Sequence, residues 1–425
     1  MPNLSLPTIG DIEAARRELP EDFVFRTPLE PHARLSNQHG ADIYLKREDM
    51  QGGRSYKRRG AGNAMLLLPP ETRKKGVVCA SAGNHSQGFS ASCNYFHVHG
   101  VVFMPKNTPQ QKIDATRQLG NGFVEIRLVG DTFDEANVAA RNYVAETGAS
   151  YIHPFDDGDT IAGQGTVALE IFEQMSAIQR KVDLLLVPVG GGGLVAGSAI
   201  CACGKSPQTK VIGVEPEHAA AMHASLEQGH LVTLQRDRMS RFVDGAAVLT
   251  PGELTFQAVR DLDVQIRTVP EDRVCGTMID LFNREGMVTE PAGVLSIDAL
   301  TDIAADIHGQ TVVCVLSGSN FDLSRYPDVL ERSDRFRRRK RYFTVEMPNR
   351  PEALSELLDL ITTSSVNISD IDFHQVASGG MANCFIGLES IESGVLDQAV
   401  LRLRGYGTVE EETKNPLLAE LLKRR

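Results

Sequence analysis

The sequence predicts an α/β protein built mainly on parallel β-sheet. Apolar, β-branched runs recur along the first three quarters of the chain and alternate with longer segments of helical periodicity. Several of these runs end in small or polar residues directly before a helix, which is the pattern of parallel β–α units. The expected strands are residues 77–79, 98–103, 123–129, 184–189, 211–214 and 311–316, and the clearest helices are 132–146 and 160–175.

Composition is that of an ordinary globular enzyme. The chain has 425 residues, of which 42% are hydrophobic and 23% are charged, and its formal net charge at pH 7 is −11. This length predicts two or three domains, and the acidic balance argues against nucleic-acid binding. The seven cysteines are odd in number and lie mostly in apolar runs. We therefore expect free thiols in a reducing, cytoplasmic compartment.

Neither the N-terminus nor the longest apolar stretch indicates a membrane protein. The first residues lack a basic start and a continuous apolar core, so no secretory signal is expected. Residues 184–203 are long enough to tempt a membrane assignment, but Pro188 and four consecutive glycines would disrupt a lipid-exposed helix. This stretch is therefore expected in a protein core.

Four consecutive glycines at 190–193 lie between an expected strand and a helix. Without Cβ atoms their N–H groups can converge on a phosphate, and the helix start adds partial positive charge. Residues 191–196 also match a dinucleotide fingerprint, with Glu215 placed as the ribose-binding acid. The phosphate-loop-like segment 204–206 lacks its upstream glycine and precedes a strand, so we exclude a nucleoside-triphosphate site.

A lysine upstream of the glycines favours the phosphate of an aldehyde cofactor over that of a dinucleotide. Lys57 lies in a polar turn bracketed by glycines, where its amine could be held as an imine to an aldehyde cofactor. For any single lysine a solvated surface position is the usual explanation, but two further motifs favour function. Residues 77–88 predict strand, turn and helix, with backbone donors for a carboxylate and the Asn84 amide for a ring hydroxyl. Residues 311–320 end another strand at Ser317.

At these positions the chain resembles the fold-type II pyridoxal-phosphate enzymes and, within them, the biosynthetic threonine dehydratases. The resemblance extends from about residue 20 to the C-terminus. It departs from the usual pattern at Tyr56, where phenylalanine is common, and at Ser319, where glycine or alanine is frequent. The motifs that carry it are Ser55-Tyr-Lys-Arg-Arg-Gly-Ala61, Ser81-Ala-Gly-Asn-His85, Gly190 to Gly193 with Leu194, Glu290-Pro-Ala-Gly293 and Ser317-Gly-Ser-Asn320.

The resemblance implies a fold and a site. Two lobes of open twisted sheet, similar to the tryptophan synthase β-subunit, would form a catalytic domain over residues 1–334, with the smaller lobe at about 55–155. Lys57 and Ser81 are the implied catalytic residues, and no metal ligand is expected. The implied pyridoxal 5′-phosphate ligands are Lys57, Asn84 at the 3′-oxygen, Gly190, Gly191, Gly192, Gly193 and Leu194 at the phosphate, and Ser317 at the pyridine nitrogen. The implied substrate residues are Ser55, Ser81, Ala82, Gly83, Asn84 and His85.

The implied reaction is β-elimination and deamination of L-threonine to 2-oxobutanoate and ammonia, the first step of isoleucine biosynthesis. The sequence gives no separate measure of room for the γ-methyl group, so L-serine dehydratase or racemase activity stays open. The alternatives from other classes are a nicotinamide-dinucleotide oxidoreductase and a catalytically inactive amino-acid sensor.

The C-terminal quarter has a different organisation. Residues 335–341 are strongly basic, and we interpret them as a linker rather than a nucleic-acid patch. Residues 342–425 then predict the order βαββαβ, which resembles one ACT-like regulatory module. The expected strands are 342–347, 366–374, 383–388 and 407–411, and the expected helices are 351–362 and 396–403.

This module suggests an effector and an assembly. The family's Pro-Gly-Ala-Leu turn is Pro351-Glu-Ala-Leu354 here, and the charged Glu352 weakens the expectation that isoleucine or valine binds at this turn. A purely structural dimerisation domain is the alternative. Open strand edges favour pairing with another copy, so we expect a homo-oligomer, specifically a tetramer.

Overall fold

The computed structural model describes residues 3–361, 365–375, 380–392, 394–413, 415 and 418. The chain divides into two compact units, Met1–Leu323 and Ser324–Arg425. The second unit thus begins before the expected boundary at residue 334. The residues expected as a linker contain the end of helix α14 (Tyr326–Phe336) and the start of strand β11 (Lys340–Pro348), both in the second unit.

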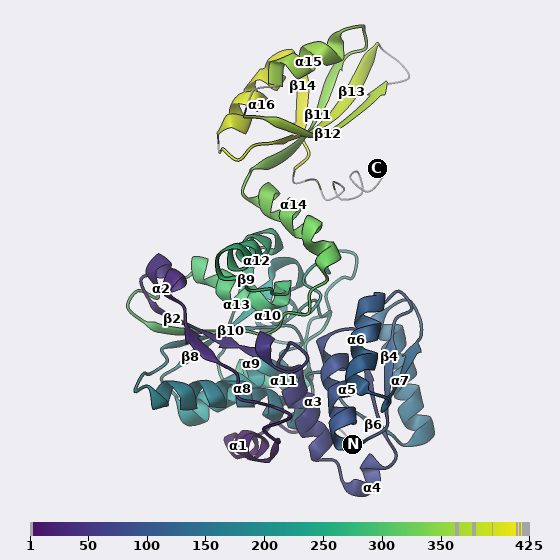
Figure 1. The fold of residues 1–425 in the computed structure, drawn as a ribbon, viewed down its shortest axis with the longest axis vertical. Helices are drawn as coiled ribbons and strands as arrows, with labels where there is room; N and C mark the ends of the chain where they lie inside the picture. The colour runs from purple at the N-terminus through teal and green to yellow at the C-terminus, as the bar shows by residue number, and fades with distance from the viewer. Residues whose placement is uncertain are drawn as a thin grey trace. The chain divides into compact units, whose positions relative to one another are not determined.

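The larger sheet of the first unit has six strands in the order β1-β2-β10-β7-β8-β9. Figure 1 labels β2, β10, β8 and β9 of this sheet. β1 pairs with β2 antiparallel, and the other neighbours are parallel. β7 and β10 are buried along their whole length, which explains their continuous apolar sequences. The strands are β1 (Leu29–Pro31), β2 (Asp42–Arg47), β7 (Leu184–Pro188), β8 (Lys210–Pro216), β9 (Gln265–Val269) and β10 (Thr311–Leu316).

The smaller sheet is parallel and has helices on both faces (Figure 1). Helix α7 (Phe133–Thr147) packs Ala136 and Ala140 against one face. Helices α5 (Asn84–Phe96) and α6 (Gln110–Gly120) pack against the other. In the order β5-β4-β3-β6, the strands are β5 (Val124–Leu128), β4 (Gly100–Met104), β3 (Val77–Ala80) and β6 (Ser150–Tyr151).

Helices α8 (Gly158–Ala177) and α9 (Gly193–Lys205) pack closely because small residues face one another. A Cβ on Gly197 would lie 2.5 Å from the Ile161 carbonyl oxygen, so the contact excludes larger residues. The other helices of this unit are α1 (Ile9–Glu18), α2 (Ala33–His39), α3 (Lys57–Leu66), α4 (Pro70–Arg73), α10 (Ala221–Gln228), α11 (Glu253–Asp261), α12 (Glu271–Glu285) and α13 (Leu295–Asp298), with 3-10 turns η1 (Glu48–Met50), η2 (Glu217–Ala219), η3 (Pro291–Val294), η4 (Ala299–Thr301) and η5 (Leu323–Arg325), the last spanning the division.

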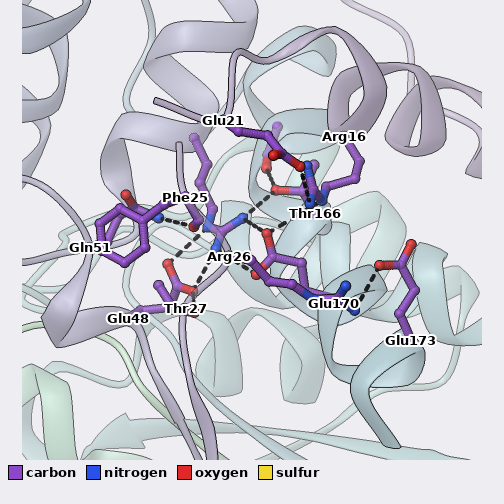
Figure 2. Close-up of polar contacts among 12 residues, drawn as sticks. Arg16, Glu21, Phe25, Arg26, Thr27, Glu48, Gln51, Thr166, Glu170 and Glu173 are labelled. Carbon is purple, nitrogen blue, oxygen red and sulfur yellow. Dashed lines mark hydrogen bonds and ion pairs between the residues drawn. The ribbon is translucent and has the colours of Figure 1, made fainter. Parts of the chain in front are cut away.

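A buried ion-pair network connects α3 to β2, η1 and α8. Figure 2 labels Glu48, Thr166 and Glu170 of this network. Arg59 donates to both carboxylate oxygens of Glu48 and of Glu170, and Lys46 donates to Glu170 at 2.8 Å. All four side chains are fully buried. Burial opposes ionisation of Glu170, but Arg59 and Lys46 outweigh it and lower its pKa to about 2. The network thus pairs Arg59 and Lys46 with Glu48 and Glu170, and Arg16, which is partly exposed, adds a further contact to Glu170 at 3.5 Å.

The second unit has the ferredoxin-like order βαββαβ expected of an ACT-like module. Its antiparallel sheet has the strand order β12-β13-β11-β14. Helices α15 and α16 share one core with the sheet, including Phe343, Val345 and Leu403. Thr362, at the end of the expected first helix, lies outside the described residues. The elements after β11 are α15 (Ala353–Ile361), β12 (Asn367–Gln375), β13 (Met381–Glu389), α16 (Val395–Tyr406) and β14 (Thr408–Glu411).

Two sequence expectations about burial are confirmed. The long apolar stretch 184–203 forms β7, the glycine turn and most of α9, and it lies in the core of the first unit. Across the described part of the chain, every helix is too short or too polar to span a membrane. The cysteines are free thiols, all buried except Cys203.

Candidate active site

A cavity of about 530 Å³ is lined by residues from both sheets of the first unit. Its size is typical of small-molecule sites. It lies where β3 and β7 end and their helices begin, which is where parallel sheets usually bind ligands. The site residues expected from sequence that line it are Lys57, Ser81, Ala82, Gly83, Asn84, His85, Gly190, Gly191, Gly192, Gly193 and Leu194.

The two central positions of the glycine turn, Gly191 and Gly192, have room only for glycine. A Cβ on Gly191 would lie 2.3 Å from the Phe155 ring, and Gly192 has φ of +96°. The hydroxyl of Thr255 donates to the Gly191 carbonyl oxygen at 2.7 Å, which fixes the turn. Helix α9 starts at Gly193 without a side-chain cap. Its first N–H groups can therefore bind an anion such as a phosphate.

Lys57 is the first residue of α3 and lines the same cavity. Its Nζ donates to the Pro154 carbonyl oxygen at 3.0 Å. Burial lowers the pKa of Lys57 to about 8, although the Glu290 carboxylate partly opposes the shift. An amine with this pKa is substantially neutral near pH 8, so it can act as a nucleophile or a base.

The turn after β3 presents donors to the cavity. Ser81 accepts a hydrogen bond from the Gly83 N–H at 3.2 Å, and α5 begins at Asn84 with no side-chain cap. Its first N–H groups are therefore available to a carboxylate. The Asn84 side chain donates to Glu290 and accepts from Asn320, both at 2.7 Å.

Two histidines at the cavity are held neutral. Burial lowers the pKa of His85 and of His153 to about 3. The Nε2 atom of His85 lies 3.0 Å from the Ile152 carbonyl oxygen. The Nδ1 atom of His153 accepts from the backbone N–H groups of Phe155 and Asp156. Neither imidazole is thus a cation at neutral pH, which leaves Lys57 as the titrating base among these three.

Two expected residues are not among those lining the cavity. Ser55 and Ser317 are buried, with exposed fractions of 2% and 4%. Ser55 forms an isolated bridge with Gly318, and the Ser317 hydroxyl donates to the Ala292 carbonyl oxygen at 3.4 Å. The Tyr56 N–H donates to the Ser317 carbonyl oxygen at 3.4 Å. Ser317 is therefore hydrogen-bonded to Tyr56, the residue next to Lys57 in the chain. Its role toward a ring nitrogen stays a prediction.

Two ion pairs that the sequence did not predict join the two lobes across the cavity. Lys112 on α6 pairs with Asp244, and Asp134 on α7 pairs with Arg236. Asp244 and Arg236 lie between α10 and α11, and all four residues line the cavity. Their spacing in the sequence gives no signal, because each pair joins segments more than a hundred residues apart.

Glu215 does not have the position that the dinucleotide alternative requires. Its two carboxylate oxygens accept from the backbone N–H groups of Met222 and His223, at 2.9 and 2.8 Å. The side chain is fully buried, and burial raises its pKa to about 8. Glu215 therefore stabilises the start of α10 and is unavailable to a ribose hydroxyl.

Comparison with known proteins identifies the family. A family model described as pyridoxal-phosphate dependent enzyme matches residues 20–318. The chain belongs to this family. It is 44% identical over 399 residues, 93% of this chain, to L-threonine dehydratase biosynthetic IlvA of Mycobacterium bovis, covering 91% of that protein. It is 42% identical to the Bacillus subtilis protein of the same name, covering 87% of this chain and 86% of that one.

Solved structures agree with this assignment. The processed form of threonine deaminase isoform 2 from Solanum lycopersicum superposes with a TM-score of 0.72 at 36% identity, over 78% of this chain and 92% of that one. Maize serine racemase superposes with a TM-score of 0.71 at 26% identity, over 79% of this chain and all of that one. The nicotinamide alternative is therefore wrong, and the enzyme depends on pyridoxal phosphate.

The cavity fits this cofactor. The glycine turn and the uncapped start of α9 suit its phosphate, because they line the cavity and the first N–H groups of a helix without a side-chain cap can donate to an anion. The Lys57 amine has the nucleophilic character that covalent attachment of an aldehyde requires. Residues 190–194, Lys57 and Asn84 would hold the cofactor, which is electron-withdrawing when bound.

Proposed function

We propose that this enzyme eliminates the β-hydroxyl of L-threonine and releases 2-oxobutanoate and ammonia, as the first step of isoleucine biosynthesis. The observation that carries the proposal is the position of Lys57, an amine of lowered pKa between a phosphate-binding turn and a carboxylate-binding turn. The relatives of highest similarity named above are biosynthetic L-threonine dehydratases.

We infer that the turn 81–85 binds the substrate carboxylate. The start of α5 has no side-chain cap, so its N–H groups can donate to an anion. The hydroxyl of Ser81 lies beside them and accepts from Gly83. The His85 imidazole is neutral, so it adds no positive charge at this turn. Fixing the carboxylate in this way orients the Cα–H bond for proton removal.

Lys57 is the proposed base that removes the Cα proton. General-base catalysis works best when the pKa lies near the operating pH, and it typically contributes about 10² to 10⁴ in rate. Burial brings the pKa of Lys57 to about 8, close to that condition. Ser317 is neutral, unlike a carboxylate, so next to a ring nitrogen it would not stabilise a proton there.

The test is a comparison of kcat/KM for L-threonine and L-serine with detection of the 2-oxo acid product. We expect L-threonine to be preferred by roughly 10- to 200-fold, the range that one methyl-sized contact can provide. Lys57→Ala should abolish turnover, and borohydride reduction of the wild-type holoenzyme should label Lys57. A clear preference for L-serine would favour the serine dehydratase or racemase alternative.

We also propose that the enzyme is a cytoplasmic homotetramer whose C-terminal unit senses isoleucine or valine. The support is the four-stranded sheet of that unit, whose outer strands β12 and β14 each have one edge with no strand neighbour among the described residues. Isoleucine should inhibit the full chain, and truncation after Leu323 should remove the inhibition but keep turnover. Light scattering measures the number of subunits. If isoleucine does not change the kinetics with L-threonine, the regulatory proposal is refuted and the catalytic proposal is unaffected.

A further inference from the structure

The Asn84 side chain is held at both ends of its amide. Asn320 Nδ2 donates to Asn84 Oδ1 at 2.7 Å, and Asn84 Nδ2 donates to Glu290 Oε1 at 2.7 Å. The Asn320 amide also donates to the Gly53 carbonyl oxygen at 2.8 Å, which uses its second hydrogen. The flanking groups are therefore a donor on one side and an acceptor on the other. They permit one orientation of the Asn84 amide and disfavour the reverse.

The Glu290 carboxyl is buried and packs closely against Gly318. Its exposed fraction is 4%, and a Cβ on Gly318 would lie 2.1 Å from Glu290 Oε1. The Glu290 backbone N–H donates to the Gly318 carbonyl oxygen at 3.3 Å, so this segment is fixed next to strand β10. Burial, with repulsion from Asp244, raises the pKa of Glu290 to about 7, while the Asn84 bond opposes the rise. In either protonation state the side chain retains an acceptor oxygen.

Asn84 has one donor left for the cavity. Its amide nitrogen carries two hydrogens, and the hydrogen bonds of the described residues use one of them, toward Glu290. Asn84, Glu290 and Asn320 all line the cavity next to Lys57. A ring oxygen that bears negative charge is stabilised by an N–H and repelled by a carbonyl oxygen. Which atom of the amide faces the cofactor therefore matters.

We propose that Glu290 and Asn320 are positioning residues, which orient the Asn84 amide so that an N–H, and not the oxygen, faces the 3′-oxygen of pyridoxal phosphate. The inference deepens the proposed site, since it rests on the contact between Asn84 and the cofactor. It gives a role to Glu290 and Asn320, which the motif comparison singled out without assigning any. Both act through Asn84 and not on the substrate.

The sharpest test reverses the polarity of the two contacts to Asn84 with side chains of nearly the same size. Asn320→Asp also loses the donor to the Gly53 carbonyl oxygen, and Asn320→Ala shares that loss. In the double variant Glu290→Gln with Asn320→Asp, the new Gln amide can donate to Asn84 Oδ1 and the new Asp can accept from Asn84 Nδ2. The Asn84 oxygen would then occupy the position that faces the cofactor. The single variant Glu290→Gln keeps an acceptor for Asn84, so it should have a smaller effect.

The readouts are cofactor binding and absorbance. Titration of the apoenzyme with pyridoxal 5′-phosphate should give a dissociation constant about tenfold or more weaker for the double variant, as expected for one lost charge-assisted hydrogen bond. The pH midpoint of the holoenzyme absorbance should rise, because the anionic oxygen loses a donor. Binding within twofold of wild type together with an unchanged pH midpoint would overturn the proposal.

Three further variants complete the test. If the double variant does not fold by circular dichroism, Asn320→Ala, which removes the donor to Asn84 Oδ1, should shift both readouts in the same direction, and no shift would overturn the proposal. Asn63→Ala is the matched control, because Asn63 is buried and donates at 2.7 Å to the Asp159 carbonyl oxygen outside the cavity lining. An equal shift in this control would also overturn it. Asn84→Ala distinguishes the failures: unchanged absorbance there refutes the cofactor contact itself.

Discussion

Replacing Arg59 should destabilise the first unit more than any surface change. Its guanidinium donates five hydrogen bonds, at 2.8 to 3.1 Å, to Glu48, Glu170 and Thr166. These use all five of its N–H groups. In Arg59→Met, the buried Glu48 carboxylate would lose the cation with which it is paired, whereas Glu170 would keep Lys46 and the partly exposed Arg16, whose Nε lies 3.5 Å from it.

The expected cost follows from that loss. Lys46 still pairs with Glu170, whereas Glu48 retains only the hydroxyl of Thr27, at 2.6 Å. Removing one partner of a buried ion pair costs about 3 to 5 kcal/mol in the free energy of unfolding. Arg59→Lys keeps the charge but cannot reproduce the planar fork between two carboxylates, so we expect an intermediate loss of about 2 kcal/mol.

The assay is urea unfolding of the full chain, followed by far-ultraviolet circular dichroism, with the change in free energy taken from the midpoint at unchanged slope. The control is Lys74→Met, which breaks the exposed pair between Lys74 and Glu71. Such pairs contribute at most about 1 kcal/mol. If Arg59→Met costs no more than Lys74→Met, the buried network does not stabilise the fold and the reasoning is refuted.

Three other outcomes are expected. The rate at which pyridoxal phosphate attaches to the apoenzyme should rise with pH with a midpoint near 8, because Lys57 becomes neutral above its lowered pKa. A midpoint near 10.5, the ordinary pKa of lysine, would show that burial does not lower the pKa of Lys57. Gly191→Ala should weaken cofactor binding at least tenfold in an absorbance titration, since a Cβ would lie 2.3 Å from the Phe155 ring, and wild-type affinity would show that the turn can move. Glu352→Gly should raise the free energy of unfolding of the second unit by about 1 kcal/mol, because Glu352 is exposed and has φ of +73°, a conformation that glycine adopts without strain. A lower free energy of unfolding measured by calorimetry would show that Glu352 is not strained.

The sequence predicted the structure best where the structure depends on residues close together in the chain. Strands β7 and β10 are buried on both faces, so their continuous apolar runs predicted them directly. Strands β2 and β9 were not predicted, because charged residues interrupt their apolar pattern, as with Lys46 and Arg267. Lys46 lies inside the protein because Glu170 neutralises it, and Glu170 is 124 positions away in the chain.

The same distinction applies to the site. The motifs around Lys57, Asn84 and the glycine turn could be recognised from sequence, because backbone turns between strand and helix require particular residues within a few positions. The orientation of the Asn84 amide depends on Glu290 and Asn320, which are 206 and 236 positions away. Local residue preferences thus determined the turns that we propose as anion-binding sites. Only the tertiary structure decided which side chains meet at them, because hydrogen-bond partners and burial depend on contacts between segments that the chain order does not specify.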